Sequence, residues 1–238
     1  MDGNDRPGSP YFSDAMSTAQ IDTERPAVFR LLSHTRFGGK VLLQLNYIVW
    51  FKARPAASIL DIYAGAFDGI NFRVTLGSDG RPLLFDTVHN CGCYHKFFPV
   101  APLVRNDEAN GFWTEQPLVP QEIDRAGAVP VLHVASRTHY VDRISFSPRG
   151  GDEAYRWDDY ARLRSLPIAD GTYRSLFGVH GLIAGSERPE RHVLWPMGIR
   201  SPGAMRQWGH HATAFVGRRH FDDPTLIEQL FTLEKEMP

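Results

Sequence analysis

The chain has 238 residues, of which 42% are hydrophobic and 22% are charged, and its formal net charge is -1. These values are ordinary for a folded protein and unlike those of a disordered one, and a chain of this length can bury a substantial core. The basic residues are dispersed apart from the short run at residues 218–220, so no stripe of positive charge predicts nucleic-acid binding. We therefore expect no nucleic-acid partner.

Residues 1–20 are rich in Gly, Pro, Ser and Asp and have no apolar central region, unlike a signal peptide. This composition predicts a flexible N-terminal leader, residues 1–25, followed by a single globular β-rich domain, residues 26–238. The most apolar stretch, residues 41–51, is shorter than the roughly 20 residues of a membrane-spanning helix. We therefore expect a cytoplasmic protein with no membrane partner.

Alternation of apolar and polar residues predicts that strands dominate the fold. In residues 41–51, Gln44 and Asn46 alternate with apolar residues before a continuous apolar run, which indicates a central strand that passes from a half-exposed into a buried setting. Residues 70–85 contain two apolar runs around the turn residues 77–80, which predicts a hairpin. Further strands are expected at residues 129–136, 139–146, 192–197 and 212–216.

Helical patterns are few. Short helices are expected at residues 155–166 and 201–208, the second opening on a Ser-Pro pair typical of a helix start. The last helix has the clearest pattern, because Asp223 can cap it and Pro224 fits its first turn. Its apolar stripe at helical spacing consists of Leu226, Ile227, Leu230 and Leu233. The fold class predicted is α+β, predominantly β, with antiparallel sheets, a few short helices and a C-terminal amphipathic helix.

One cluster carries unusual chemistry. His89, Cys91, Cys93 and His95 occupy every second position of one short segment. Cys91 and Cys93 are the two cysteines of the chain. In a strand this spacing projects all four side chains from one face. Alternate side chains are about 7 Å apart, however, whereas zinc ligands lie within about 2.3 Å of the ion. Gly92 permits the bend or bulge that would bring two or three of these groups together.

The hairpin register predicts a carboxylate beside this cluster. If Leu76 pairs with Arg81 across the turn, Asp68 falls opposite His89. Such a carboxylate commonly accepts a hydrogen bond from the far ring nitrogen of a metal-bound histidine. In the alternative interpretation, Asp68 begins a turn with Gly69.

Three interpretations of the cluster remain open. It is a zinc or other transition-metal site, a thiol redox site in which Cys91 and Cys93 form a reversible disulfide, or a strand with buried cysteines and hydrogen-bonded histidines. A metal site would need a further ligand from a distant histidine. The candidates near the C-terminus are His210, His211 and His220, and those on the middle strands are His133 and His139.

The sequence contains no phosphate-binding loop, dinucleotide fingerprint, nucleophile elbow or His-Glu-x-x-His motif. The function expected from the cluster is that of a metal-binding protein, acting as a metal-dependent hydrolase in which Asp68 or Asp86 orients a ligand or acts as the base. The alternatives are a non-catalytic, metal-stabilised binding or scaffold domain and a thiol redox protein. The sequence identifies neither a substrate nor a protein partner.

Overall fold

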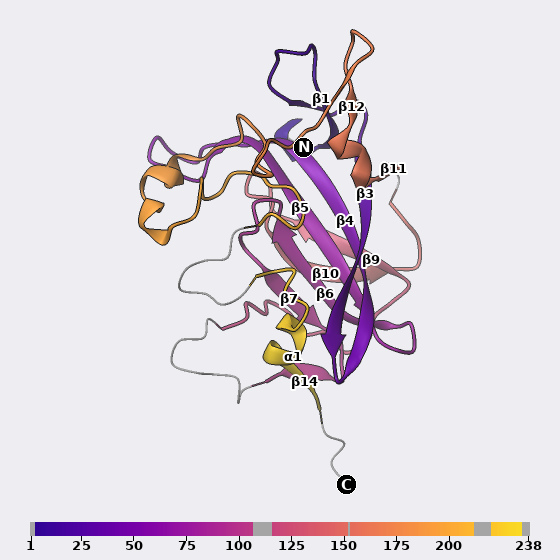
Figure 1. Ribbon diagram of the computed structural model, residues 1–238. Coiled ribbons are helices and arrows are strands. Elements are labelled where there is room, and N and C mark those ends of the chain that lie inside the picture. Colours follow the sequence, from indigo (N-terminus) through magenta and orange to yellow (C-terminus); the bar gives the residue numbers. More distant parts are fainter. Residues whose placement is uncertain (1–2, 107–115, 152, 212–219, 235–238) are drawn as a thin grey trace.

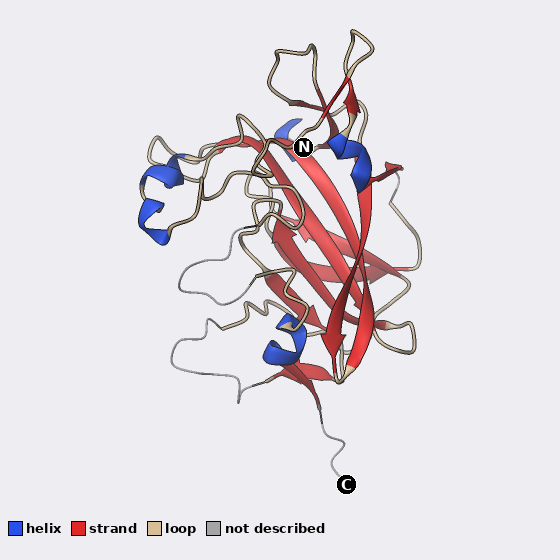
Figure 2. Cartoon of the chain, in the orientation of Figure 1, coloured by secondary structure: helices blue, strands red, loops and turns tan. Residues whose placement is uncertain are grey.

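The computed structural model describes residues 3–106, 116–151, 153–211 and 220–234 (Figure 1). Strands make up most of the regular structure, and the one α-helix in these ranges, α1 (Leu226–Leu230), has five residues (Figure 2). The prediction of a predominantly β protein with antiparallel sheets is confirmed. Within the same ranges, no helix is long and apolar enough to cross a membrane.

A twisted, eight-stranded sheet forms the frame of the molecule. Its strands follow the order β11, β3, β4, β5, β6 and β7, while β1 pairs with both β2 and β4. All neighbours are antiparallel except β11 and β3. The strands are β1 (Pro7–Tyr11), β2 (Gln20–Asp22), β3 (Ala27–Phe37), β4 (Lys40–Arg54), β5 (Gly65–Leu76), β6 (Pro82–His89), β7 (Lys96–Pro99) and β11 (Arg156–Asp159).

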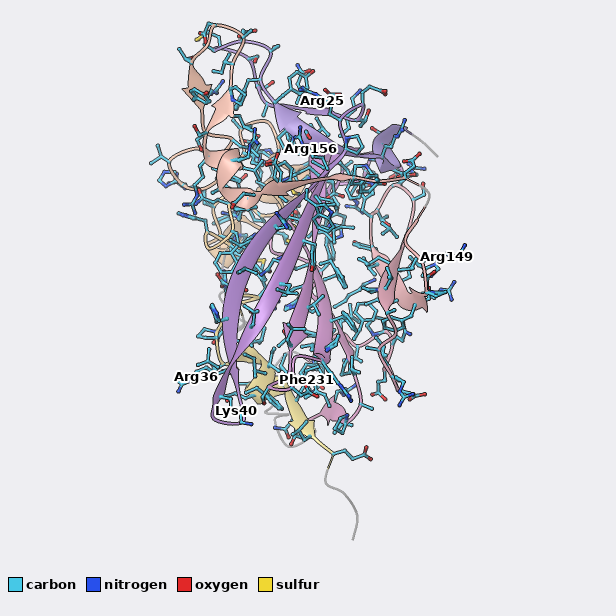
Figure 3. All side chains as sticks on the ribbon, turned by 90° about the vertical axis from the view of Figure 1, so that its right-hand side faces the viewer. Arg25, Arg36, Lys40, Arg149, Arg156 and Phe231 are labelled. Atoms are coloured by element: carbon cyan, nitrogen blue, oxygen red, sulfur yellow. The ribbon has the colours of Figure 1, made fainter. Side chains whose placement is uncertain are left out.

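The strands β3 and β4 span the length of the sheet. Figure 3 shows Arg36 and Lys40 at the end where β3 turns into β4, and Arg25 and Arg156 at the opposite end. The predicted hairpin is present as β5 and β6. The alternation of apolar residues along these strands therefore identified the centre of the sheet correctly.

Smaller elements surround the sheet. The strands β9 (Val129–Val134) and β10 (Val141–Ser147) lie in two of the segments predicted as strands, and they form a separate hairpin. The other strand pairs are β8 (Leu103–Arg105) with β14 (Phe231–Leu233) and β12 (Leu166–Pro167) with β13 (Tyr173–Arg174). The 3-10 helices are η1 (Gly3–Asp5), η3 (Tyr160–Arg164), η4 (Pro189–His192) and η5 (Trp195–Met197).

The two faces of the sheet are covered by different parts of the chain. On one face, Val141 of β10 belongs to an apolar cluster with Phe72 and Phe85 of the central hairpin. On the other face, Trp50 packs in a cluster that includes buried residues between positions 160 and 205. Full burial of side chains of this size contributes about 1.5–3 kcal/mol each, so both coverings stabilise the sheet.

Gln44 and Asn46 of β4 are buried, so the prediction that this part of the strand is half-exposed is wrong. Gln44 accepts a hydrogen bond from the Ser33 hydroxyl at 3.0 Å and donates to the Thr75 hydroxyl at 3.1 Å. Asn46 donates to the same Ser33 hydroxyl at 2.9 Å and accepts from the Asn71 amide at 3.0 Å. A buried polar side chain is tolerated when such partners satisfy it.

Much of the segment predicted to be a flexible leader is built into the structure. Strand β1 pairs Pro7 with Phe51 of β4, and β2 pairs with β1. The Asp5 carboxylate accepts a hydrogen bond from the Arg137 backbone N–H at 2.7 Å. Backbone pairing and the Asp5 carboxylate therefore hold this segment against the rest of the molecule.

Several predicted helices and one predicted strand are wrong. The segment predicted as a helix at residues 155–166 forms β11 and η3, because its first half pairs with β3. Residues 201–208 form no helix and contain turns and one isolated β-bridge, between Arg206 and Leu182. Residues 192–197, predicted as a strand, lie at the 3-10 helices η4 and η5. The strand predicted at residues 212–216 lies outside the described residues.

The predicted C-terminal amphipathic helix is shortened to α1. After Leu230 the chain becomes extended, and β14 pairs with β8. Leu226, Ile227 and Phe231 are buried in one apolar cluster, whereas Leu233 is exposed. Pairing with β8 therefore takes the place of the last helical turn that the apolar spacing predicted.

Candidate functional site

The predicted cluster at residues 89–95 is a turn between two strands. β6 ends at His89, and β7 begins at Lys96. The His89 backbone N–H donates to the Cys93 carbonyl oxygen at 3.0 Å, and the Gly92 N–H donates to the His89 carbonyl oxygen at 2.7 Å. Gly92 has a φ of +89°, which glycine adopts without a steric penalty. The prediction that all four cluster side chains project from one face of a strand is therefore wrong.

The turn brings the two cysteine side chains together. Cys91 is buried, Cys93 is half-buried, and both are free thiols. The Cys93 backbone N–H donates to the Cys91 Sγ at 3.4 Å, and the two thiols are also in hydrogen-bonding contact. This contact with Cys93, together with burial, raises the pKa of the Cys91 thiol well above its ordinary value. At neutral pH Cys91 is therefore protonated.

Asp68 lies beside this turn, as predicted, but in a different register. The hairpin pairs Ile70 with His89 and has an irregularity between Thr75 and Leu76, so the predicted pairing of Asp68 directly opposite His89 is wrong. The two side chains meet diagonally, and the His89 Nδ1 lies 3.2 Å from the Asp68 Oδ1. The alternative interpretation of Asp68 as the start of a turn does not apply, because it lies within β5.

Asp68 is held between two imidazoles. The His139 Nδ1 lies 2.8 Å from the Asp68 Oδ2, and the His139 Nε2 lies 3.4 Å from the Asp5 Oδ1. The His139 ring stacks on Phe51, with ring centroids 3.9 Å apart. Burial alone would raise the pKa of Asp68, but the charges and hydrogen bonds of the two histidines outweigh it and hold this pKa well below its ordinary value. Asp68 is therefore an ionised carboxylate.

The Asp68 carboxylate fixes the tautomer of His89. An ionised carboxylate only accepts hydrogen bonds, so the His89 Nδ1 carries the proton. In the neutral ring the Nε2 then has a free lone pair. This Nε2 is buried and has no hydrogen-bond partner among the described residues. His89 is therefore arranged to take up a proton from, or to coordinate, a group that lies beside it.

Backbone strain is concentrated around this site. Phe67, Tyr94 and His139 are not glycines, yet each has a positive φ, between 54° and 58°. Such conformations cost of order 1–3 kcal/mol each and persist where the surrounding structure imposes them. Because they flank Asp68, the cysteine turn and the second imidazole, they support a functional role for this region.

Arg188 completes the surroundings of Asp68. Its guanidinium donates to the Ala66 carbonyl oxygen at 3.3 Å and to the Phe67 carbonyl oxygen, and its Nη2 lies 3.9 Å from the Asp68 Oδ1. Arg188 is only 3% exposed. Sequence reasoning did not identify it, because it lies in a polar, proline-containing segment that resembles an exposed loop. No pattern in the sequence connects residue 188 to residue 68.

A pocket opens beside Asp68 and the cysteine turn. Its walls come from the end of β4, the following loop, the turn between β6 and β7, and the segment around η4. The half-exposed rings of Tyr63 and Tyr94 lie at its rim. The lining residues are Arg54, Tyr63, Asp68, His89, Cys91, Tyr94, Arg188, Glu190, Gly203 and Met205. His89 and Cys91 therefore face the same space.

Asp86, the second predicted catalytic carboxylate, belongs to a different constellation. Both of its oxygens lie 3.0 Å from the Arg73 Nε, and its Oδ2 also lies 3.0 Å from the Arg73 Nη2. The His95 Nε2 lies 3.6 Å from the Asp86 Oδ1. Because Asp86 and His89 are three residues apart on β6, their side chains point to opposite faces of the sheet. The structure therefore separates Asp86 and His95 from His89.

The distant histidines proposed as further ligands occupy varied positions. His211 packs against the turn, since a β-carbon on Gly92 would lie 3.0 Å from its side chain, and burial lowers its pKa to about 3. His210 packs against Gly181 instead. His133 bonds to the Ser145 hydroxyl at 2.8 Å on the outer hairpin, and His220 pairs with Asp222. Only His139 and His211 therefore approach the site.

The positions of these histidines do not test the prediction of a metal site. Within the ranges that the structure describes, no group of three or more His, Cys, Asp and Glu side chains is arranged as a metal ion would require. Two thiols and an unpaired imidazole nitrogen are nevertheless the donor types that zinc prefers. The prediction of a zinc site therefore stays a prediction.

Comparison with known proteins gives no further guide. No protein-family model, curated protein or solved structure matches the chain.

Proposed function

We propose that Cys91 and Cys93 form a redox-active dithiol that becomes a disulfide by exchange with a substrate disulfide. One observation carries this proposal, namely the turn in which the Cys93 N–H donates to the Cys91 sulfur and the two thiols are in contact. Thiols in contact can close a disulfide with little movement of the backbone. The protein would then act as a thiol–disulfide oxidoreductase.

Cys93 is the attacking group, because it is half-buried whereas Cys91 is buried. The Cys93 thiolate attacks one sulfur of the substrate disulfide, forms a mixed disulfide and expels the first substrate thiolate. Cys91 then loses its proton and attacks the Cys93 sulfur, which expels the second substrate thiolate. Two electrons pass from the dithiol to the substrate, and the two expelled thiolates take up the two protons that the cysteines release.

His89 is the base for the second step. It lines the same pocket as Cys91, and its buried Nε2 has a lone pair that can accept the Cys91 proton. Asp68 then stabilises the imidazolium that forms, because its carboxylate lies 3.2 Å from the Nδ1. The resting thiol of Cys91, with its raised pKa, needs such a base.

A buried guanidinium assists the thiolates. The Arg206 backbone N–H donates to the Asn90 carbonyl oxygen at 2.9 Å, which ties Arg206 to the cysteine turn. Burial lowers the pKa of Arg206, and the charges of Cys91 and Cys93 partly offset this effect. The same attraction stabilises a cysteine thiolate relative to the thiol.

A metal centre is the second candidate, and the unpaired Nε2 of His89 favours it. Cys91, Cys93 and His89 would hold a zinc ion, and Asp68 would orient the histidine. With an open fourth position, the ion would supply Lewis-acid chemistry for a hydrolase; with a fourth protein ligand, it would stabilise the fold. The side chains would have to converge further than they do here.

A redox titration in the presence of a chelator tests the dithiol. The protein is equilibrated with mixtures of reduced and oxidised dithiothreitol, and the remaining thiols are counted by alkylation and mass spectrometry. We expect one two-electron transition at a defined potential, absent from Cys91→Ser and Cys93→Ser. If no intramolecular disulfide forms at any potential, the dithiol proposal is wrong.

The metal candidate has its own readout. Elemental analysis of untagged protein near one equivalent of zinc, with both thiols protected from alkylation until a chelator is added, would support the metal centre. Protein that takes up no zinc on reconstitution, and whose thiols react equally with and without chelator, would exclude it.

A further inference from the structure

Two neighbouring segments expose large apolar side chains to solvent. In the loop between β4 and β5, Ile59 is fully exposed and Leu60 is 82% exposed. Trp195 of η5 is 71% exposed, and Val193, between η4 and η5, is exposed as well. Single exposed apolar residues are ordinary on a protein surface, but groups of them mark places where another molecule binds.

A backbone hydrogen bond joins the two segments. The Glu190 N–H in η4 donates to the Ile62 carbonyl oxygen at 3.0 Å. Figure 1 accordingly shows the loop between β4 and β5 beside the η4–η5 segment, on one flank of the sheet. The exposed apolar side chains of the two segments therefore form one surface. We call it the apolar tip, and it consists of Ile59, Leu60, Val193 and Trp195.

Hydrogen bonds within the chain hold the loop between β4 and β5 in shape. The Asp61 carboxylate accepts hydrogen bonds from the backbone N–H groups of Ala57 and Tyr63, both at 3.0 Å. The Arg137 guanidinium donates to the Ala56 carbonyl oxygen near the start of the loop. The polar groups of the loop are thus paired inside the chain, while its two apolar residues of the tip stay in solvent. Their exposure is therefore a built feature of the loop.

The exposed charges of the two segments are all positive. Within residues 52–64 and 188–200, every one of which is described, the exposed charged side chains are those of Lys52, Arg191 and Arg200. The carboxylates of the same ranges are engaged or buried, because Asp61 binds the loop backbone and Glu190 is buried. An apolar surface with basic neighbours matches a partner that is both anionic and apolar.

We propose that the apolar tip binds the surface of an anionic lipid bilayer. Ile59 and Leu60 enter the boundary between headgroups and acyl chains. The ring of Trp195 lies at the headgroup level, where its apolar faces and its N–H are both accommodated. Arg191 and Arg200 then contact the phosphate groups of the lipids.

A bilayer suits this surface better than a protein partner does. Lipid can close around a tip made of two short segments, whereas a protein would need a matching, complementary surface. The expectation of no membrane partner was based on the length of apolar stretches, and binding to a bilayer surface needs no spanning segment. The tip draws its residues from two separate segments, so no single stretch of sequence reveals it.

This orientation places the pocket of the cysteine turn close to the bilayer. Tyr63 of the same loop and Glu190 of η4 both line that pocket. Binding to lipid depends on the apolar tip alone, however, and requires no thiol chemistry. The inference therefore goes beyond the proposed dithiol function, and Cys91→Ser should bind vesicles as wild type does.

Cosedimentation with lipid vesicles tests the inference. We expect wild type to bind vesicles of phosphatidylcholine and phosphatidylserine at least about tenfold more tightly than vesicles of phosphatidylcholine alone, because each exposed basic side chain contributes about fivefold at an anionic surface. Added salt should weaken this preference. Wild type that binds neither kind of vesicle overturns the inference.

Variants of the tip locate the binding surface. Ile59→Ser/Leu60→Ser and Trp195→Ser, in separate segments, should each weaken binding to the anionic vesicles at least about fivefold, because less apolar area enters the bilayer. The matched control is Leu32→Ser/Val41→Ser on β3 and β4, whose side chains are 63% and 69% exposed, and it should bind as wild type does. Thermal melts should be unchanged in all three, since exposed side chains are replaced. Unweakened binding in both tip variants, or an equal loss in the control, contradicts the assignment.

Charge variants test the basic residues in the same way. Arg191→Gln/Arg200→Gln should weaken binding to the anionic vesicles about tenfold or more and leave binding to the neutral vesicles unchanged. Arg36→Gln/Arg149→Gln removes the same charge from exposed positions elsewhere, both seen in Figure 3, and should have little effect. Equal losses in the two double variants would show that net charge, and not this surface, attracts the lipid.

Two further measurements separate a bilayer from a protein partner. Phosphatidylcholine brominated in its acyl chains, mixed into the anionic vesicles, should quench the fluorescence of wild type more than that of Trp195→Phe, because the Trp195 ring lies at the membrane boundary. Size-exclusion chromatography gives the other outcome. A wild-type dimer that dissociates in the tip variants, together with equal quenching of wild type and Trp195→Phe, would make the tip an interface between two copies of this chain and would overturn the inference.

Discussion

Two buried carboxylates on neighbouring strands, Asp68 and Asp86, have opposite surroundings. Asp68 is 1% exposed and Asp86 is 0% exposed. Burial tends to raise both pKa values, but neighbouring positive charges hold both below the ordinary value. The nearest partner of Asp86 is the guanidinium of Arg73 at 3.0 Å, whose charge is permanent, and the His95 imidazole lies farther away at 3.6 Å. The nearest partners of Asp68 are two imidazoles at 2.8 and 3.2 Å, which can gain and lose protons, and the Arg188 guanidinium lies farther away at 3.9 Å.

This difference separates a structural ion pair from a site suited to chemistry. The Arg73 and Asp86 side chains satisfy each other through three contacts of 3.0 Å and leave no group directed at the pocket. The Asp68 carboxylate instead fixes one nitrogen of His89 and leaves the other buried, unpaired and next to a cysteine. Equal burial and similar pKa directions therefore do not indicate equal function.

The largest loss of stability is expected when Asp86, the carboxylate of the structural ion pair, is replaced. Asp86→Leu leaves the Arg73 guanidinium buried without its partner, which should lower the free energy of unfolding by about 3–5 kcal/mol. The double variant Arg73→Met/Asp86→Leu removes both charges and should recover most of that loss. Urea denaturation of the three proteins measures both effects. Equal stability of the single and double variants would contradict the assignment.

A smaller stability effect and a larger kinetic one are expected at Asp68. Asp68→Asn removes charged hydrogen bonds to His89 and His139, which should lower the free energy of unfolding by about 3 kcal/mol. The asparagine amide can also turn an N–H toward His89 and favour the wrong tautomer, so disulfide closure should slow by more than about tenfold. Stopped-flow measurement of the mixed-disulfide step and the closure step distinguishes this effect from general destabilisation.

The lowered pKa of Asp68 also predicts how this loss depends on pH. A carboxyl group with a lower pKa in the folded state stabilises the protein above its unfolded pKa of about 3.9, and this contribution disappears as the pH falls toward the folded value. The difference in unfolding free energy between wild type and Asp68→Asn should therefore be full at pH 7, should begin to fall below about pH 4, and should be lost only as the pH approaches the lowered folded pKa. A difference that stays constant as the pH falls below about 4 would show that Asp68 acts through packing.

An intermediate loss of stability is expected when Gly92 of the cysteine turn is replaced by Ala, and the same substitution at Gly80 is the control. Gly80 and Gly92 both have positive φ, +77° and +89°, but a β-carbon at Gly80 has no atom within 4 Å, whereas one at Gly92 lies 3.0 Å from His211. Substitution of either by Ala should cost about 1–2 kcal/mol through the backbone. Gly92→Ala should exceed Gly80→Ala in melting-temperature loss and should also alter the redox potential. Identical behaviour of the two variants would mean that His211 moves aside.

The sequence predicted the sheet and the presence of Asp68 near His89, because both depend on local alternation and on one hairpin. It did not predict the register, since a one-sided irregularity at Leu76 shifts the pairing without changing the pattern. The burial of Gln44 and Asn46 was also missed, because their partners come from neighbouring strands. Local spacing cannot reveal such cross-strand hydrogen bonds.

Only those residues of the candidate site that lie close together in the sequence could be predicted. Cys91, Cys93 and His89 belong to one short segment, and Gly92 indicated the bend that brings the thiols together. His139 was identified only as one of several distant histidines, and Arg188 was not identified. Both reach Asp68 from segments far along the chain, so their placement depends on tertiary packing that no local pattern encodes.

The smallest effect is expected at His133, which contrasts with His139 on the same hairpin. His133 lies on β9, partly exposed, and bonds to Ser145, so His133→Ala should change the free energy of unfolding by about 0.5 kcal/mol or less. His139 is buried against Asp68 and Phe51, and its replacement should be much more costly. Disulfide closure should keep its wild-type rate in His133→Ala, because this side chain contacts neither Asp68 nor the pocket. A slower closure in His133→Ala would show that the outer hairpin influences the dithiol by a route other than His139, and would contradict the placement of the reactive groups around Asp68.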